Sequence, residues 1–166
     1  TDAASVFSVL RSKKLNLRYG TASILELESG SNDPWAYMLT VIILSVMKGG
    51  ATAGGFVVSL LAQVFFGVGF GALISLGAVY LIKRVRFDAA GFDAIFVTAI
   101  AILSYALPSA VGGNGYLSCY IVGIVLGNTK ISGKTALVHF FDGITGFTQI
   151  LLFFLLGLLA FPSQTI

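Results

Sequence analysis

Long apolar stretches with few charges occupy most of this chain of 166 residues. Hydrophobic residues make up 57% of the chain and charged residues only 10%, whereas charged residues make up about 25% of a typical soluble domain. Inside a bilayer the backbone must satisfy its hydrogen bonds internally, and stretches of this length do so as helices. The sequence therefore predicts an all-α, polytopic membrane helix bundle.

The apolar stretches predict five full spans and one partial span. Their ranges are about 1–10 (partial), 21–47, 54–82, 91–110, 114–128 and 137–161, within a single transmembrane domain at 1–166. A helix of about 10 residues rises only about 15 Å, half of a hydrocarbon core about 30 Å thick. We therefore expect the chain to begin inside a helix, as an internal fragment of a longer protein.

Lysine and arginine are distributed unevenly among the predicted loops. Nine of the ten lie at 11–18, 83–86 and 130–134, and the tenth, Lys48, lies in an alternate loop. Because cytoplasmic loops carry the excess of basic residues, these three loops are predicted to be cytoplasmic, and the chain enters the span at 21–47 from that side. The same distribution explains the net charge of +3 without nucleic acid, which we do not expect as a partner.

The motif Gly67-Val68-Gly69-Phe70-Gly71 lies inside the apolar stretch at 54–82. A glycine pattern of this kind in a soluble βα unit would suggest dinucleotide binding. Inside a long apolar helix, small residues more often let a neighbouring helix approach closely. The motif therefore predicts close helix packing.

A polar segment, Glu28-Ser29-Gly30-Ser31-Asn32-Asp33-Pro34, interrupts the apolar stretch at 21–47. Charge at bilayer depth is expensive and usually has a function. Asp33 lies near the middle of the stretch beside Pro34, which cannot donate a backbone hydrogen bond to the carbonyl of Gly30. Oxygen ligands suit hard cations. The segment therefore predicts a site for a proton or a small cation such as Na⁺ or K⁺.

On a helix, the polar side chains of this segment fall on adjoining stripes. Ser29 and Asp33 share a face, Glu28 and Asn32 form the neighbouring stripe, and Glu26 lies two turns from Asp33. An isolated membrane Ser or Asn is more often interhelical glue than a ligand, but this combination with carboxylates favours an ion site. We expect a polar wedge of Ser29, Asn32 and Asp33, with Glu26 either on its access path or at the membrane interface and Glu28 as a structural member.

The first two residues, Thr1 and Asp2, supply a second set of oxygen atoms. If the partial span ends at Arg11, they lie at about half the bilayer depth. From there the hydroxyl and the carboxylate are expected to face Asp33 across the bundle.

Three sets of motifs carry a resemblance to a known family. They are Thr1-Asp2-Ala3-Ala4 with Leu27-Glu28-Ser29-Gly30-Ser31-Asn32-Asp33-Pro34, Gly112-Gly113-Asn114-Gly115-Tyr116-Leu117 with Leu126-Gly127-Asn128, and Phe140-Phe141-Asp142-Gly143 with Phe153-Phe154-Leu155-Leu156-Gly157-Leu158. Together they resemble bacterial monovalent cation/proton antiporters of the NhaP type, over essentially the whole chain. The resemblance implies a fragment of an inverted-repeat antiporter fold.

The resemblance implies a secondary active transporter rather than an enzyme, exchanging protons for Na⁺ or K⁺ by alternating access. Asp33 would bind the proton and the cation in turn, with Asn32 as its partner. Glu28 would also be a candidate to pair with a basic residue of a later helix. The implied ion- and proton-binding residues are Asp33, Asn32, Ser29, Glu28, Asp2 and Thr1, with Asp33, Ser29 and Thr1 as ligands of the monovalent cation.

The resemblance also implies a multi-pass protein of the bacterial plasma (inner) membrane, embedded in the lipid bilayer and homodimeric at full length. No cofactor is expected besides the transported ions. The competing interpretation is a proton-translocating subunit of a multisubunit membrane complex. Such subunits use lysine together with glutamate at mid-membrane, and no lysine of this chain lies at mid-span.

Overall fold

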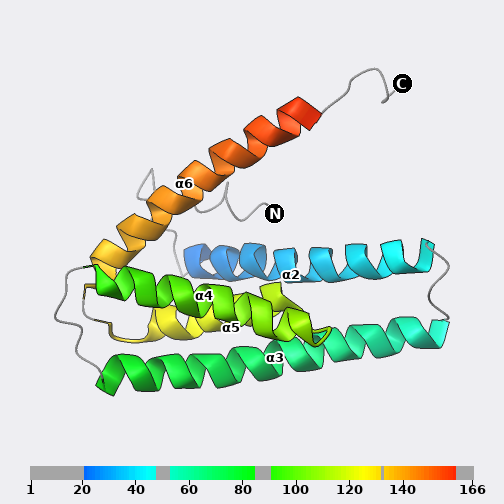
Figure 1. Cartoon of the computed structure of the whole chain (residues 1–166), viewed down its shortest axis with the longest axis horizontal. Helices are drawn as coiled ribbons and strands as arrows, with labels where there is room; N and C mark the ends of the chain where they lie inside the picture. The colour runs from blue at the N-terminus through cyan, green and yellow to red at the C-terminus, as the bar shows by residue number, and fades with distance from the viewer. Residues whose placement is uncertain (1–20, 48–52, 85–90, 132, 160–166) are drawn as a thin grey trace. The chain divides into compact units, whose positions relative to one another are not determined.

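The structure is a computed structural model that describes residues 21–47, 53–84, 91–131 and 133–159. Within these ranges the regular elements are helices, which Figure 1 labels: α2 (Thr21–Met47), α3 (Ala53–Arg84), α4 (Phe92–Ala110), α5 (Gly115–Asn128) and α6 (Lys134–Leu159). The all-α prediction is confirmed. The predicted partial span at 1–10 lies outside the described residues.

The chain divides into two compact units. The first comprises 1–86 and 98–129, and so contains α2, α3, α5 and the later part of α4. The second comprises 87–97 and 130–166, and so contains the start of α4 and the whole of α6. A single transmembrane domain over 1–166 stays a prediction.

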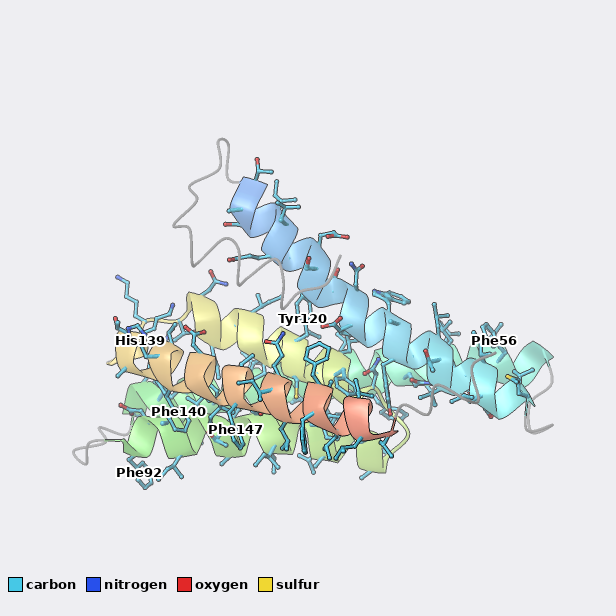
Figure 2. The ribbon with its side chains drawn as sticks, turned by 90° about the horizontal axis from the view of Figure 1, so that it is seen from above. Phe56, Phe92, Tyr120, His139, Phe140 and Phe147 are labelled. Carbon is cyan, nitrogen blue, oxygen red and sulfur yellow. The ribbon has the colours of Figure 1, made fainter. Side chains whose placement is uncertain are left out.

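Among the described helices, three are long and apolar enough to cross a membrane, over Gly54–Arg84, Phe92–Ala110 and Lys134–Leu159. The fourth apolar helix, α5, has 14 residues and rises only about 21 Å. With its 27 residues, α2 is long enough to rise about 40 Å, but it carries the polar segment. In the second unit, α6 leaves most of its apolar side chains exposed, including Phe140 and Phe147, which Figure 2 labels. Exposed apolar surface on this scale suits a helix surrounded by lipid.

Two glycines of α3 bring it close to α5. A Cβ atom added to Gly67 would lie 2.9 Å from the carbonyl oxygen of Asn114, and one added to Gly71 would lie 3.1 Å from the Cα atom of Ser118. A Cβ atom added to Gly69 would meet no described neighbour within 4 Å. The prediction of close helix packing is therefore confirmed for Gly67 and Gly71, four residues apart on one face, but not for Gly69.

A tight turn joins α4 to α5, and three glycines shape it. Gly112 has φ of +79°, a conformation that favours glycine. A Cβ atom on Gly113 would lie 2.6 Å from the Cβ atom of Phe66, and one on Gly115 would lie 2.5 Å from the carbonyl oxygen of Tyr105. Glycine is therefore favoured at position 112 by the backbone conformation, and at positions 113 and 115 by the lack of room for a Cβ atom.

The later part of α4 runs antiparallel to α5. The Tyr105 and Tyr116 rings are 5.2 Å apart between centroids, while Cys119 lies further along α5 and contacts earlier residues of α4. Its Sγ atom is 3.0 Å from the Ser104 Oγ atom and 3.3 Å from the carbonyl oxygen of Ala101. Since α3 and α5 run parallel, α3, α4 and α5 have the alternating directions expected of successive membrane crossings.

Candidate functional site

The polar segment Glu28–Pro34 lies within α2, which continues as a helix through Pro34. Within the segment, Asn32 Nδ2 donates a hydrogen bond to Glu28 Oε1 at 3.1 Å. Ser31 Oγ donates to the carbonyl oxygen of Glu28 at 2.8 Å. Glu28 and Asn32 are thus neighbours on one stripe of the helix, as their spacing of four residues predicts.

Ser29 and Asp33 lie in different surroundings. Ser29 is 0% exposed and its Oγ atom has no hydrogen-bond partner among the residues the structure describes. Asp33 is exposed, and no described side chain pairs with its carboxylate. The structure therefore covers Ser29 and leaves Asp33 exposed, and the polar wedge of Ser29, Asn32 and Asp33 stays a prediction. Residues four apart differ by about 40° around a helix, which is enough for one side chain to be covered and the next to lie beyond the covered side.

The remaining predicted site residues are placed less completely. Glu26 is half-buried on the turn of α2 that precedes the polar segment. Thr1 and Asp2, expected to face Asp33, lie outside the described residues. The predicted set of ligands on two helices therefore stays a prediction.

The side chains of Asn114, the residue before α5, and of Tyr120 on α5 donate hydrogen bonds to main-chain oxygens of α2. Asn114 Nδ2 donates to the carbonyl of Pro34 at 2.9 Å, and the Tyr120 hydroxyl donates to the carbonyl of Leu27 at 2.8 Å. Figure 2 labels Tyr120 at the place where α5 faces α2. Because the earlier residue of α5 meets the later residue of α2, these helices are antiparallel. Neither contact was predicted, since these residues are far apart in the sequence and meet only when the two helices pack.

Asn114 connects three helices. It is 0% exposed and is the N-cap residue of α5, where its Oδ1 atom accepts from the N–H of Leu117 at 3.1 Å. Its own N–H donates to the carbonyl of Gln63 on α3 at 3.1 Å, and its carbonyl accepts from the N–H of Ser118 at 3.2 Å. With its bond to Pro34, Asn114 satisfies its polar groups internally, as a buried amide must.

Gly30 lies where α2 approaches the Tyr120 ring of α5. A Cβ atom added to Gly30 would lie 2.9 Å from Cε2 of Tyr120. Farther along α2, the Tyr37 ring lies 4.6 Å from the Tyr116 ring between centroids. The polar segment of α2 thus contacts α5 through main-chain oxygens and Gly30. The contact between the Tyr37 and Tyr116 rings lies just after the segment.

Comparison with known proteins assigns the chain to a family and shows how much of its relatives it covers. The K(+)/H(+) antiporter NhaP2 of Shewanella oneidensis is 40% identical over an alignment of 169 positions, which covers 99% of this chain and 29% of the relative. The K(+)/H(+) antiporter NhaP of Alkalimonas amylolytica is 36% identical over 99% of this chain and 29% of its own length. The Na(+)/H(+) antiporter NhaS2 of Synechocystis is 27% identical over 98% of this chain and 31% of its own length.

The chain therefore spans less than a third of the length of these curated relatives. No solved structure matches it. The family model described as sodium/hydrogen exchanger, transmembrane, matches residues 1–165. By this match over nearly its whole length, the chain belongs to the sodium/hydrogen exchanger family of transmembrane proteins.

Proposed function

We propose that this chain is part of a secondary transporter that exchanges protons for Na⁺ or K⁺, and that Asp33 binds the proton and the cation in turn. The observation that carries the proposal is the exposed Asp33 carboxylate within an apolar helix, with no described side chain paired to it. The relatives at 36–40% identity are named K(+)/H(+) antiporters, which makes K⁺ the first cargo to test. Their names do not favour the alternative of a proton-translocating subunit.

Charge explains why one carboxylate would couple the two flows. An ionised Asp33 with a bound monovalent cation is neutral, and so is a protonated Asp33. The empty, ionised carboxylate carries a full charge that hydrocarbon disfavours. The site therefore changes its exposure from one side of the membrane to the other only when it holds a proton or a cation. Movement of one ion in each direction is then coupled, which is exchange. Ser29 and Asn32 would contribute uncharged oxygens, and Thr1 and Asp2 would contribute theirs from the preceding span.

Alternating access requires the site to open to one side at a time. In this proposal the spans that carry Thr1, Asp2 and Asp33 move against the remaining helices. The protein lies in the bacterial inner membrane as a homodimer at full length, with the loops at 11–18, 83–86 and 130–134 in the cytoplasm. The parallel directions of α3 and α5 support one part of this arrangement, in which both helices end on the same side of the membrane.

Asp33→Asn tests the proposal in the full-length protein reconstituted into proteoliposomes. The amide keeps the size of the carboxylate but cannot exchange a proton for a cation, so we expect proton movement on addition of K⁺ or Na⁺ to disappear while membrane insertion is retained. Asp93→Asn makes the same chemical change in the first turn of α4 and should preserve exchange. Cation-driven proton movement that persists in Asp33→Asn would show the assignment to be wrong.

A further inference from the structure

The two hydrogen bonds from α5 to α2 bracket the polar segment. Leu27 precedes its first residue and Pro34 is its last, so both of its carboxylates lie between the two contacts. The seven-residue step from Leu27 to Pro34 rises about 10.5 Å, and the six-residue step from Asn114 to Tyr120 rises about 9 Å. The two antiparallel helices therefore match in register over two turns.

Both acceptors are main-chain oxygens. A side chain bonded to a backbone carbonyl sets the depth and rotation of the helix itself, whatever rotamers the helix's own side chains adopt. Asp33 has no described side-chain partner, so its position relative to α5 depends on the placement of the α2 backbone. Tyr120 and Asn114 bond to that backbone on either side of Asp33.

The attachment of α5 to α2 differs from its attachment to α3. Gly67 and Gly71 let the backbones of α3 and α5 touch, and Asn114 adds a main-chain bond from α5 to Gln63. Packing of backbone against backbone has few alternative arrangements. The described polar contacts from α5 to α2 are two side-chain hydrogen bonds, at 2.8 and 2.9 Å. Lengthening such a bond by about 0.6–0.7 Å brings it to the limit of a hydrogen bond.

We propose that Tyr120 and Asn114 form a latch, which stabilises the arrangement of α2 on α5 seen here and releases when α2 moves during exchange. The inference rests on the proposed function, in which α2 moves against the remaining helices. Movement of α2 along α5 by one helical turn, about 5.4 Å, breaks both bonds. Tyr120 and Asn114 are positioning residues that act through the backbone and do not bind the ion.

Tyr120→Phe tests the latch, because it removes the hydroxyl and keeps the ring against Gly30. The full-length protein is assayed in vesicles of both orientations. Loss of one hydrogen bond shifts a two-state equilibrium by about twofold to tenfold, so the apparent KM for the cation should fall on one side of the membrane and rise on the other by up to that factor. Tyr116→Phe, on the same helix, removes a hydroxyl from a ring that reaches α2 by ring contact with Tyr37, and should leave both values unchanged.

Asn114→Ser gives a second test. It retains an oxygen that can cap α5 but lacks the donor that reaches Pro34, so it should shift the two KM values in the same directions as Tyr120→Phe. A change in turnover alone, or KM values that stay equal to those of the unmodified protein or move together on both sides, would overturn the latch.

Spin labels at Leu44 on α2 and Ile124 on α5, both exposed, read the latch without transport. Tyr120→Phe should change the relative populations of two label-to-label distances by about twofold to tenfold. A single distance that does not change would contradict the latch. If Asp33→Asn still exchanges ions while the distances shift, the proposed function fails and the latch stands. If Asp33→Asn is inactive and the distances do not shift, only the latch fails.

Discussion

Asp33 is exposed on α2, whereas Ser29, four residues earlier, is completely buried. The difference gives the two oxygens different parts in the proposed site. An exposed carboxylate can meet ions that arrive from a water-filled path, and a buried hydroxyl without a described partner can supply a ligand at lower cost than a hydroxyl already bonded. The residue proposed to exchange ions is therefore the accessible one.

Competition at Asp33 predicts a specific pH dependence. Because a proton and a cation exclude each other from one carboxylate, the apparent KM for K⁺ or Na⁺ should rise as the pH falls, by up to about tenfold per pH unit where the protonated form dominates. The maximal rate at saturating cation should change much less. Initial exchange rates in proteoliposomes, with equal pH on both sides before cation is added, measure both quantities. A KM that is constant across pH would argue against a shared site.

At the scale of the elements, α3 and α5 are joined through glycines whose spacing matters more than their number. Gly67 and Gly71 face α5, and Gly69, between them, faces away from the contact. In the sequence the three glycines occupy every second position and look equivalent. Helical geometry selects the pair four apart, since such residues lie on one side of a helix.

This asymmetry predicts opposite effects for two identical substitutions. Gly67→Ala places a methyl group 2.9 Å from a main-chain oxygen of α5, and we expect it to lower the free energy of unfolding by about 1–3 kcal/mol. Gly69→Ala meets no described atom within 4 Å and should be neutral or stabilising by up to about 1 kcal/mol, from helix propensity. Thermal melting of the purified full-length variants in one detergent gives the comparison. Equal melting temperatures for the two variants would contradict this account of α3–α5 packing.

For the whole molecule, the distribution of basic residues predicts the orientation in the membrane. Lys48 and Arg86 flank α3, so a single crossing by α3 puts them on opposite sides. In a Cys119→Ala background, a membrane-impermeant thiol reagent added to intact cells should label Lys48→Cys and spare Arg86→Cys. Labelling of Arg86→Cys should appear when the cytoplasmic side is opened. Labelling of both positions from outside would invalidate the predicted topology.

Much of the fold could be predicted from the chain alone, because helix length and ends depend on local features. The expected range 21–47 coincides with α2, and the expected range 91–110 differs from α4 by one residue. Apolar length and loop polarity are readable without knowing the neighbours. The polar segment was recognisable for the same reason, since charge inside an apolar stretch is conspicuous in any arrangement.

The sequence by itself determined the helices and their order, and it singled out the carboxylate that we propose to carry an ion. Only the tertiary structure decided that Ser29 is covered while Asp33 is not, and that α5 holds the α2 backbone at both ends of the polar segment. Asn114 and Pro34 are 80 residues apart, and Tyr120 and Leu27 are 93 apart. Periodicity within one helix tells which residues share a side, but not which side a neighbour covers, and such distant partners meet only when separate helices pack.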